Sequence, residues 1–82
     1  MKKYIDLRER NDYDSGHVPG AYHLDLNRLS IDITTIADLE DELLLYCYSG
    51  NRSGLGASLL QEMGYNAKSI GGISRYKGEL EC

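Results

Sequence analysis

The feature that most constrains the fold is an unbroken apolar run at residues 43–47, with the sequence Leu-Leu-Leu-Tyr-Cys. Apolar residues that do not alternate with polar ones are typical of a strand buried on both faces. Such a strand needs a covering layer on each side, and this arrangement is characteristic of parallel sheets in α/β proteins. We therefore expect a layered α/β fold that buries residues 43–47.

Helical and extended patterns alternate along the rest of the chain, which supports the same fold class with a largely parallel sheet. Apolar residues spaced three or four positions apart predict helices over residues 26–42 and 52–63. Gly64 is expected to end the second helix as its C′ residue. The shorter predicted segments are a strand at 3–7, a helical turn at 8–15, a Pro-Gly turn at 17–20, strands at 21–24 and 67–70, a break at 71–72 and a helical turn at 73–77.

The two predicted helices also carry expectations about their faces. Ser53 is a suitable N-cap for the second helix. The buried stripe of that helix is expected to contain Leu55, Leu59, Leu60 and Met63. The acidic run at 38–42 is expected to form a solvated face of the first helix, and the alternative is a docking surface for a basic partner.

Length and charge exclude several kinds of function. The chain has 82 residues, which we expect to form a single domain, residues 1–82, with a thin core. Nine basic and thirteen acidic residues give a net charge of −4, which disfavours nucleic acid as a partner. The longest apolar stretch, residues 43–48, is well short of the roughly 20 residues of a membrane span, so no membrane association is expected.

The number of cysteines is too small for a disulfide-bonded scaffold. The chain has only Cys47 and Cys82, and no Cys-x-x-Cys or His-x-x-x-His spacing points to a metal. We expect neither a metal nor another cofactor. Because no secretory signal is recognised at the N-terminus, both thiols are expected to be free in a reducing cytoplasm.

The segment that carries chemistry is the Cys47 loop, residues 47–53. A cysteine ends the buried strand, small and polar residues follow, and a helix then begins, so successive backbone N–H groups can converge on one point. These amides and the helix dipole should lower the pKa of the Cys47 thiol. The candidate binding residues of the loop are Tyr48, Ser49, Gly50, Asn51, Arg52 and Ser53.

Alternative interpretations of the two cysteines remain open. A buried cysteine at the end of a strand is often purely structural. Cysteine phosphatases and arsenate reductases also place a cysteine ahead of a helix, but with a Cys-x5-Arg loop, whereas Cys47 and Arg52 are separated by four residues. The shorter loop predicts a tighter cradle that suits a sulfur atom better than a phosphoryl group. Cys82, the final residue, is expected to be a bystander.

Four blocks of the sequence resemble the rhodanese (thiosulfate sulfurtransferase-like) family. Residues 5–9 look like its Asp-Val-Arg strand end, and residues 16–21 (Gly-His-Val-Pro-Gly-Ala) look like its Gly-His-Ile-Pro-Gly-Ala turn. The Cys47 loop looks like the active-site loop, and residues 71–73 look like the closing Gly-Gly-Ile. The resemblance extends from residue 4 to about residue 77. It implies a rhodanese-like open, mostly parallel β-sheet flanked by helices.

The resemblance also implies an activity. Cys47 would accept a sulfane sulfur as a persulfide from a donor such as thiosulfate or another persulfide, and the loop amides would stabilise it. A thiophilic acceptor, such as cyanide, a thiol or a sulfur-accepting protein, would then remove the sulfur. The alternative within the same fold is a non-catalytic interaction module, although such modules often lack the cysteine that this chain retains.

Three further residues are predicted to support the site. Asp6 and Arg8 are expected to tie the sheet end to neighbouring loops, with Arg8 near the pocket. His17 lies in a Pro-Gly turn, where a structural hydrogen-bonding role is favoured over general-base catalysis, because a thiolate of low pKa needs no base. His23 is expected on the surface or in a strand.

The chain departs from the family pattern at three places. Tyr76 replaces a common Trp, and Tyr48 occupies a position that is often basic. The chain begins almost at the Asp-Val-Arg strand, so it is expected to be N-terminally shortened by one strand and one helix. An uncovered edge on a thin core predicts either marginal stability or weak homo-oligomer formation.

Overall fold

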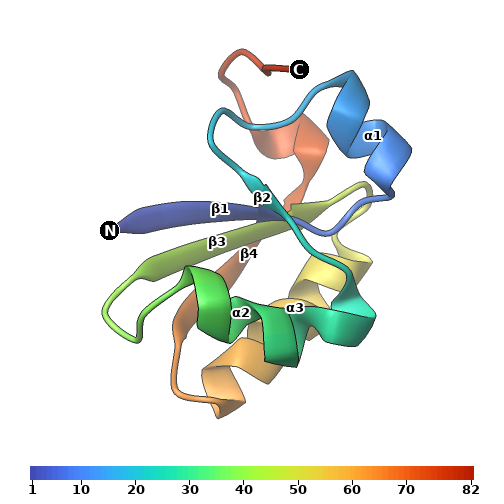
Figure 1. The fold of residues 1–82 in the computed structure, drawn as a ribbon. Coiled ribbons are helices and arrows are strands. Elements are labelled where there is room, and N and C mark those ends of the chain that lie inside the picture. The colour runs from blue at the N-terminus through green and yellow to red at the C-terminus, as the bar shows by residue number, and fades with distance from the viewer.

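A four-stranded sheet in the order β2-β1-β3-β4 organises the structure, a computed structural model that describes residues 1–82 (Figure 1). All three strand pairings are parallel, which confirms the predicted α/β class. No helix of the structure is long and apolar enough to cross a membrane. The strands are β1 (Lys2–Asp6), β2 (Tyr22–His23), β3 (Glu42–Cys47) and β4 (Asn66–Gly72), and the helices are α1 (Arg10–Ser15), α2 (Leu29–Ile36) and α3 (Asn51–Glu62), with short 3-10 turns η1 (Leu26–Arg28) and η2 (Ile73–Arg75).

Strand β3 is buried on both faces, as the apolar run predicts. Helices α2 and α3 cover one face of the sheet, while α1 and the C-terminal segment lie on the other (Figure 1). Leu43, Leu45 and Cys47 belong to the larger core cluster with residues of α2 and α3. Tyr46 belongs to a smaller cluster with Val18 on the opposite face. The face of the sheet covered by α2 and α3 therefore holds most of the buried core.

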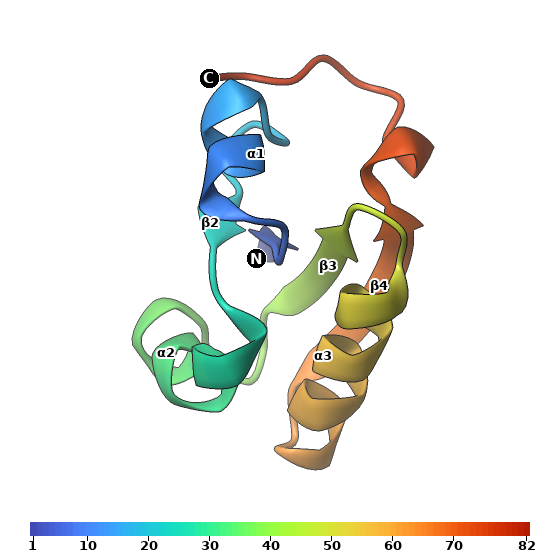
Figure 2. The same ribbon diagram turned by 90° about the vertical axis from the view of Figure 1, so that its right-hand side faces the viewer.

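Helix α3 packs along β3 and β4 with a face that matches the predicted one at Leu59 and Leu60 only (Figure 2). Leu55 of the predicted stripe is 65% exposed and Met63 is 37% exposed, so the stripe is wrong at these two positions. The backbones of the helix and the sheet approach closely, and small side chains fill this interface. The buried residues of α3 are Ser53, Gly56, Ala57 and Leu60. The end of the helix is as predicted, because the Tyr65 and Gly64 amides donate to Leu60 and Gln61 in a Schellman motif.

The predicted helix over 26–42 is too long at its C-terminal end. It consists of η1 followed by α2, and it stops at Ile36. Residues 38–41 form a turn, so the acidic run is not a helical face. Asp41 is buried there, and its carboxylate accepts hydrogen bonds from the Lys3 ammonium at 2.8 Å and from the Asp38 amide at 2.9 Å. Lys3 also donates to the last carbonyl of α2, at Ile36, and so joins the helix end to β1.

The glycine pair at residues 71–72 belongs to β4, so the predicted break there is wrong. An irregularity in the β3–β4 pairing lies between Leu45 and Tyr46, and it lets β4 continue to Gly72 beside Cys47. The two edges of the sheet are β2 and β4. The predicted consequence of an uncovered edge, marginal stability or self-association, stays a prediction.

Two glycines of α3 provide a matched test of this packing. A Cβ at Gly56 would lie 2.9–3.0 Å from side-chain carbons of the buried residues Leu7, Leu29 and Leu45, whereas a Cβ at Gly54 would meet nothing within 4 Å. Gly56→Ala should lower the free energy of unfolding by about 1–2 kcal/mol, because overpacking outweighs the gain in helix propensity. Gly54→Ala should raise it by up to about 1 kcal/mol. Urea unfolding of both variants measures the difference, and equal effects would contradict the packing described.

The Asp41–Lys3 pair predicts a pH dependence of stability. The hydrogen bond from Lys3 holds the pKa of the Asp41 carboxyl well below its usual range. The stabilising effect of the folded-state pair is therefore complete above the ordinary Asp pKa of about 3.9 and is lost as the pH falls toward the folded-state value. Asp41→Asn should lower the free energy of unfolding at pH 7, and this deficit should shrink at pH 3. Glu40→Gln, at an exposed neighbouring position, is the control and should show no such convergence.

Candidate active site around Cys47

The candidate site lies where β1 and β3 end. In parallel sheets the carboxyl ends of the strands and the helix N-termini that follow them form the usual place for ligands. Cys47 is the last residue of β3, and α3 starts at Asn51. The Cys47 loop therefore lies at the N-terminus of a helix, where backbone N–H groups can bind an anion. Cys47 itself is buried and not disulfide-bonded.

The sulfur of Cys47 accepts two backbone hydrogen bonds from its own loop. The Gly50 amide lies 3.0 Å from Sγ, and the Ser53 amide lies 3.4 Å from it. Gly50 has φ of +101°, in the left-handed region, which allows the tight turn that directs both amides inward. The predicted convergence of loop N–H groups on the thiol is therefore present in the structure.

The pKa of the Cys47 thiol is lowered although the residue is buried. Burial raises the pKa, since it disfavours the charged form. Hydrogen bonds from the Ser53 side chain and from the amides of Ser53, Gly50 and Arg52 lower it, and together they outweigh burial. The site therefore favours the thiolate, which is the nucleophilic form of cysteine.

Ser53 is not the N-cap of α3, because the cap position is Gly50. Its buried hydroxyl lies 3.5 Å from the Cys47 sulfur, 3.1 Å from the Gly50 carbonyl oxygen and 2.7 Å from the Ser69 hydroxyl. Ser69 in turn accepts a hydrogen bond from the Gly71 amide at 3.0 Å. The two serines thus link β4 to the sulfur of Cys47.

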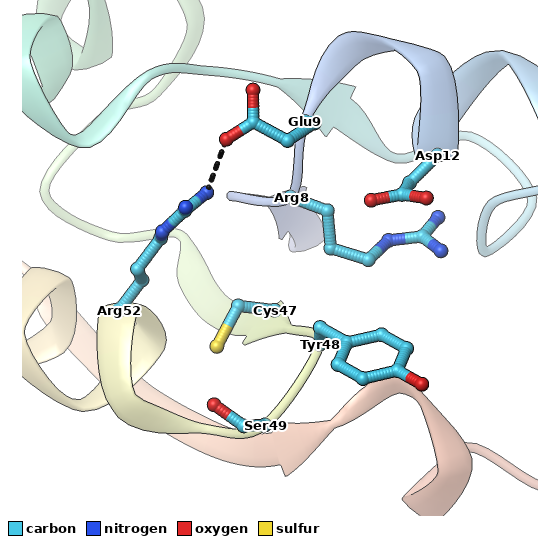
Figure 3. Close-up of a pocket in the computed structure, with 7 residues that line it drawn as sticks. All are labelled: Arg8, Glu9, Asp12, Cys47, Tyr48, Ser49 and Arg52. Carbon is cyan, nitrogen blue, oxygen red and sulfur yellow. Dashed lines mark ion pairs between the residues drawn. The ribbon is translucent and has the colours of Figure 1, made fainter.

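Cys47 lines a cavity of about 260 Å³. Figure 3 shows its side chain between the end of β1 and the loop that precedes α3. Tyr48 and Ser49 follow it along the wall, and the Tyr48 side chain is exposed. Asn51 is exposed at the start of α3. The full lining is Arg8, Glu9, Asp12, Cys47, Tyr48, Ser49 and Arg52.

The two arginines of the cavity have different surroundings. Arg8 is buried and forms a bidentate pair with buried Asp6, with its Nη2 atom 2.8 Å from a carboxylate oxygen, and it also donates to the Gly16 carbonyl at 2.6 Å. This agrees with the expected tie between the sheet end and a neighbouring loop. Arg52 is half-exposed, pairs with Glu9 at 3.0 Å and donates to the Leu7 carbonyl at 3.3 Å.

The histidines and the second cysteine lie outside the cavity. His17 stacks on Tyr13, and its Nδ1 atom lies 2.7 Å from the Tyr13 carbonyl oxygen, which fits the predicted structural role. His23 contacts the Arg8 carbonyl through Nε2 at 2.8 Å. Cys82 is exposed at the C-terminus and lies against Ser15.

Sequence reasoning missed three residues of this site. Ser69 lies on β4 and reaches the site only through the β3–β4 pairing, so no local motif marks it. Glu9 and Asp12 follow β1 in a polar stretch and line the cavity. The motif at residues 5–9 includes Glu9, but only the structure shows that its side chain faces Arg52.

The chain is similar to known proteins along nearly its whole length. The family model described as Rhodanese-like domain matches residues 1–79. Thiosulfate sulfurtransferase GlpE of Pseudomonas entomophila (strain L48) is 40% identical over 81 residues, which cover 92% of this chain and 73% of the relative. Thiosulfate sulfurtransferase PspE of Escherichia coli (strain K12) is 35% identical over 72 residues, which cover 85% and 69%. A solved structure described as a rhodanese with anions from E. coli has a TM-score of 0.89 and 29% identity, covering 99% of this chain and 98% of the other.

The contribution of Ser53 to the thiolate can be tested by alkylation. Ser53→Ala removes a side chain that lowers the pKa of Cys47, so that pKa should rise and the rate with iodoacetamide at neutral pH should fall. The measurement is the pH profile of the alkylation rate in a Cys82→Ser background. Ser58→Ala, at an exposed position of the same helix, is the control. An unchanged pH profile in Ser53→Ala would show that the hydroxyl does not act on the sulfur.

Proposed function

Because this chain is a sulfurtransferase that belongs to the rhodanese-like domain family, we propose that it carries a sulfane sulfur on Cys47 as a persulfide. The proposal rests on the position of the Cys47 sulfur. This sulfur accepts hydrogen bonds from the Gly50 and Ser53 amides, and Cys47 lines an open cavity. The names of the relatives support a sulfur donor such as thiosulfate and a thiophilic acceptor. The site residues of the proposal are Cys47 and the backbone of residues 48–53.

In the first step the Cys47 thiolate attacks the outer sulfur of the donor. With thiosulfate, the new bond joins Sγ to that sulfur, the S–S bond of the donor breaks, and sulfite leaves with the bonding electron pair. The product is a Cys47 persulfide with one negative charge. In this proposal the amides of residues 48–53 stabilise that charge, and those of Gly50 and Ser53 already donate to Sγ, the atom bonded to the charged sulfur.

In the second step an acceptor attacks the outer sulfur of the persulfide. Cyanide would leave as thiocyanate, and the electron pair of the broken S–S bond returns to Cys47 as a thiolate. The lowered pKa of Cys47 assists this step too, since a thiolate of low pKa is a good leaving group. The cycle needs no general base, which suits a cavity without a histidine.

The proposal extends to the setting of the protein. We place the reaction in one domain, residues 1–82, and in the cytoplasm, where a free catalytic thiol would be kept reduced. The natural acceptor in this proposal is a thiol, either small or on a sulfur-accepting protein. The proposal also includes weak self-association of the protein through an edge of the sheet.

The test is thiocyanate formation from thiosulfate and cyanide. Cys47→Ser should abolish it, and Cys82→Ser should retain it, because only Cys47 lies in the cavity. Mass spectrometry of the protein after thiosulfate alone should find one added sulfur on the peptide that contains Cys47. Sulfur transfer that persists in Cys47→Ser, or a phosphate ester turned over in its place, would overturn the proposal.

A further inference from the structure

The charges around the Cys47 cavity are poorly arranged for a small dianion. The charged side chains of the lining are Arg8, Glu9, Asp12 and Arg52, so their formal charges cancel. An adjoining cavity of about 400 Å³ shares Glu9 and Arg52 and adds Asp25, with no further basic residue. We use the name charged entrance for Arg8, Glu9, Asp12 and Arg52.

Both arginines of the charged entrance are already paired with carboxylates. Arg8 already holds the completely buried Asp6 through a bidentate pair, from Nε to Oδ1 and from Nη2 to Oδ2. Arg52 is paired with Glu9, with half of the Arg52 side chain exposed. Figure 3 shows Glu9 and Arg52 joined at one side of Cys47 and Asp12 near the end of Arg8. Asp12 is exposed and forms no ion pair, although it lies near the Arg8 guanidinium (Figure 3).

An exposed aromatic ring stands beside these charges. Tyr48 directly follows Cys47, lines the cavity and is 78% exposed. An aromatic ring in that position can pack against a carbon-containing group of the donor. An inorganic donor has no such group. The entrance therefore offers no net positive charge to an anion, and it adds a ring that can pack against an organic group.

We propose that Glu9 and Asp12 are specificity-determining residues that select an organic persulfide of low charge as donor over dianionic thiosulfate. This inference rests on the proposed function, since it names the donor class of the same site. The Cys47 thiolate attacks the terminal sulfur of R–S–SH, the S–S bond breaks, and R–S⁻ leaves. The proton stays on the new Cys47 persulfide until solvent takes it up, so charge and electrons balance. Thiosulfate would still react, but less efficiently, because its two charges meet the same carboxylates.

The first experiment measures how the entrance treats an anionic reagent, independently of sulfur transfer. In a Cys82→Ser background, the rate constants of Cys47 with neutral iodoacetamide and anionic iodoacetate are measured at low ionic strength. Their ratio is independent of the thiolate fraction, since both reagents attack the same thiolate. The double variant Glu9→Gln/Asp12→Asn should shift this ratio toward iodoacetate by about fivefold, and salt should suppress the shift. The matched control, Glu40→Gln/Glu62→Gln, changes the net charge equally at exposed positions away from the cavity.

Sulfur transfer is then measured with two donors and cyanide as acceptor. In the double variant, kcat/KM for thiosulfate should rise by more than the alkylation shift, because thiosulfate carries two charges. For the persulfide of 2-mercaptoethanol, whose organic part is uncharged, kcat/KM should change by less than about twofold. An unchanged thiosulfate kcat/KM, or an equal rise in the control variant, would overturn the inference. Shifted alkylation with no sulfur transfer from either donor would instead refute the proposed function and leave the charge selection at the entrance standing.

Discussion

The candidate site depends on the convergence of backbone amides on one sulfur atom at the end of a buried strand. A thiolate in a protein interior loses hydration, and that loss must be offset by donors that are already in place. The Gly50 and Ser53 amides are such donors, and they are available because the first N–H groups of α3 have no partner within the helix. Burial at the end of β3 raises the pKa of the Cys47 thiol, whereas the donors at the start of α3 lower it. The donors outweigh the burial.

The loop can take this shape only because β4 leaves room for it. A Cβ at Gly72 would collide with the Tyr48 carbonyl oxygen, and Gly50 lies against the backbone of Gly71. The irregular pairing between β3 and β4 brings Gly72 opposite Cys47. The pairing of β4 with β3 also places Ser69 next to Ser53. The hydrogen bond between their hydroxyls holds the Ser53 side chain beside the sulfur. The last strand of the sheet is thus part of the candidate site although it contributes nothing to the cavity lining.

Local features of the sequence predicted most of this arrangement, and long-range ones were missed. The apolar run at 43–47 and the alternation of elements depend on short-range pattern, so the sheet, its parallel sense and the Cys47 loop were predictable. The end of α2 was not, since it depends on Lys3 binding across to Ile36 and Asp41. The predicted buried face of α3 was wrong at Leu55 and Met63 for a related reason. Close approach of helix and sheet favours Gly56 and Ala57 over the larger Leu55, and a hydrophobic pattern alone does not reveal that distance.

The buried Asp6–Arg8 pair links the scaffold to the choice of donor. A buried guanidinium must be compensated, and Asp6 together with the Gly16 carbonyl supplies that compensation. Arg8 thereby joins β1 to the turn after α1, but its positive charge is neutralised where an anionic donor would need it. The loop amides have no comparable neutralising partner, because they act on the sulfur alone. Attraction for negative charge is therefore concentrated at the reacting atom, while the approach to it is neutral or negative. Such a distribution favours the Cys47 thiolate and gives little help to a free dianion on its way in.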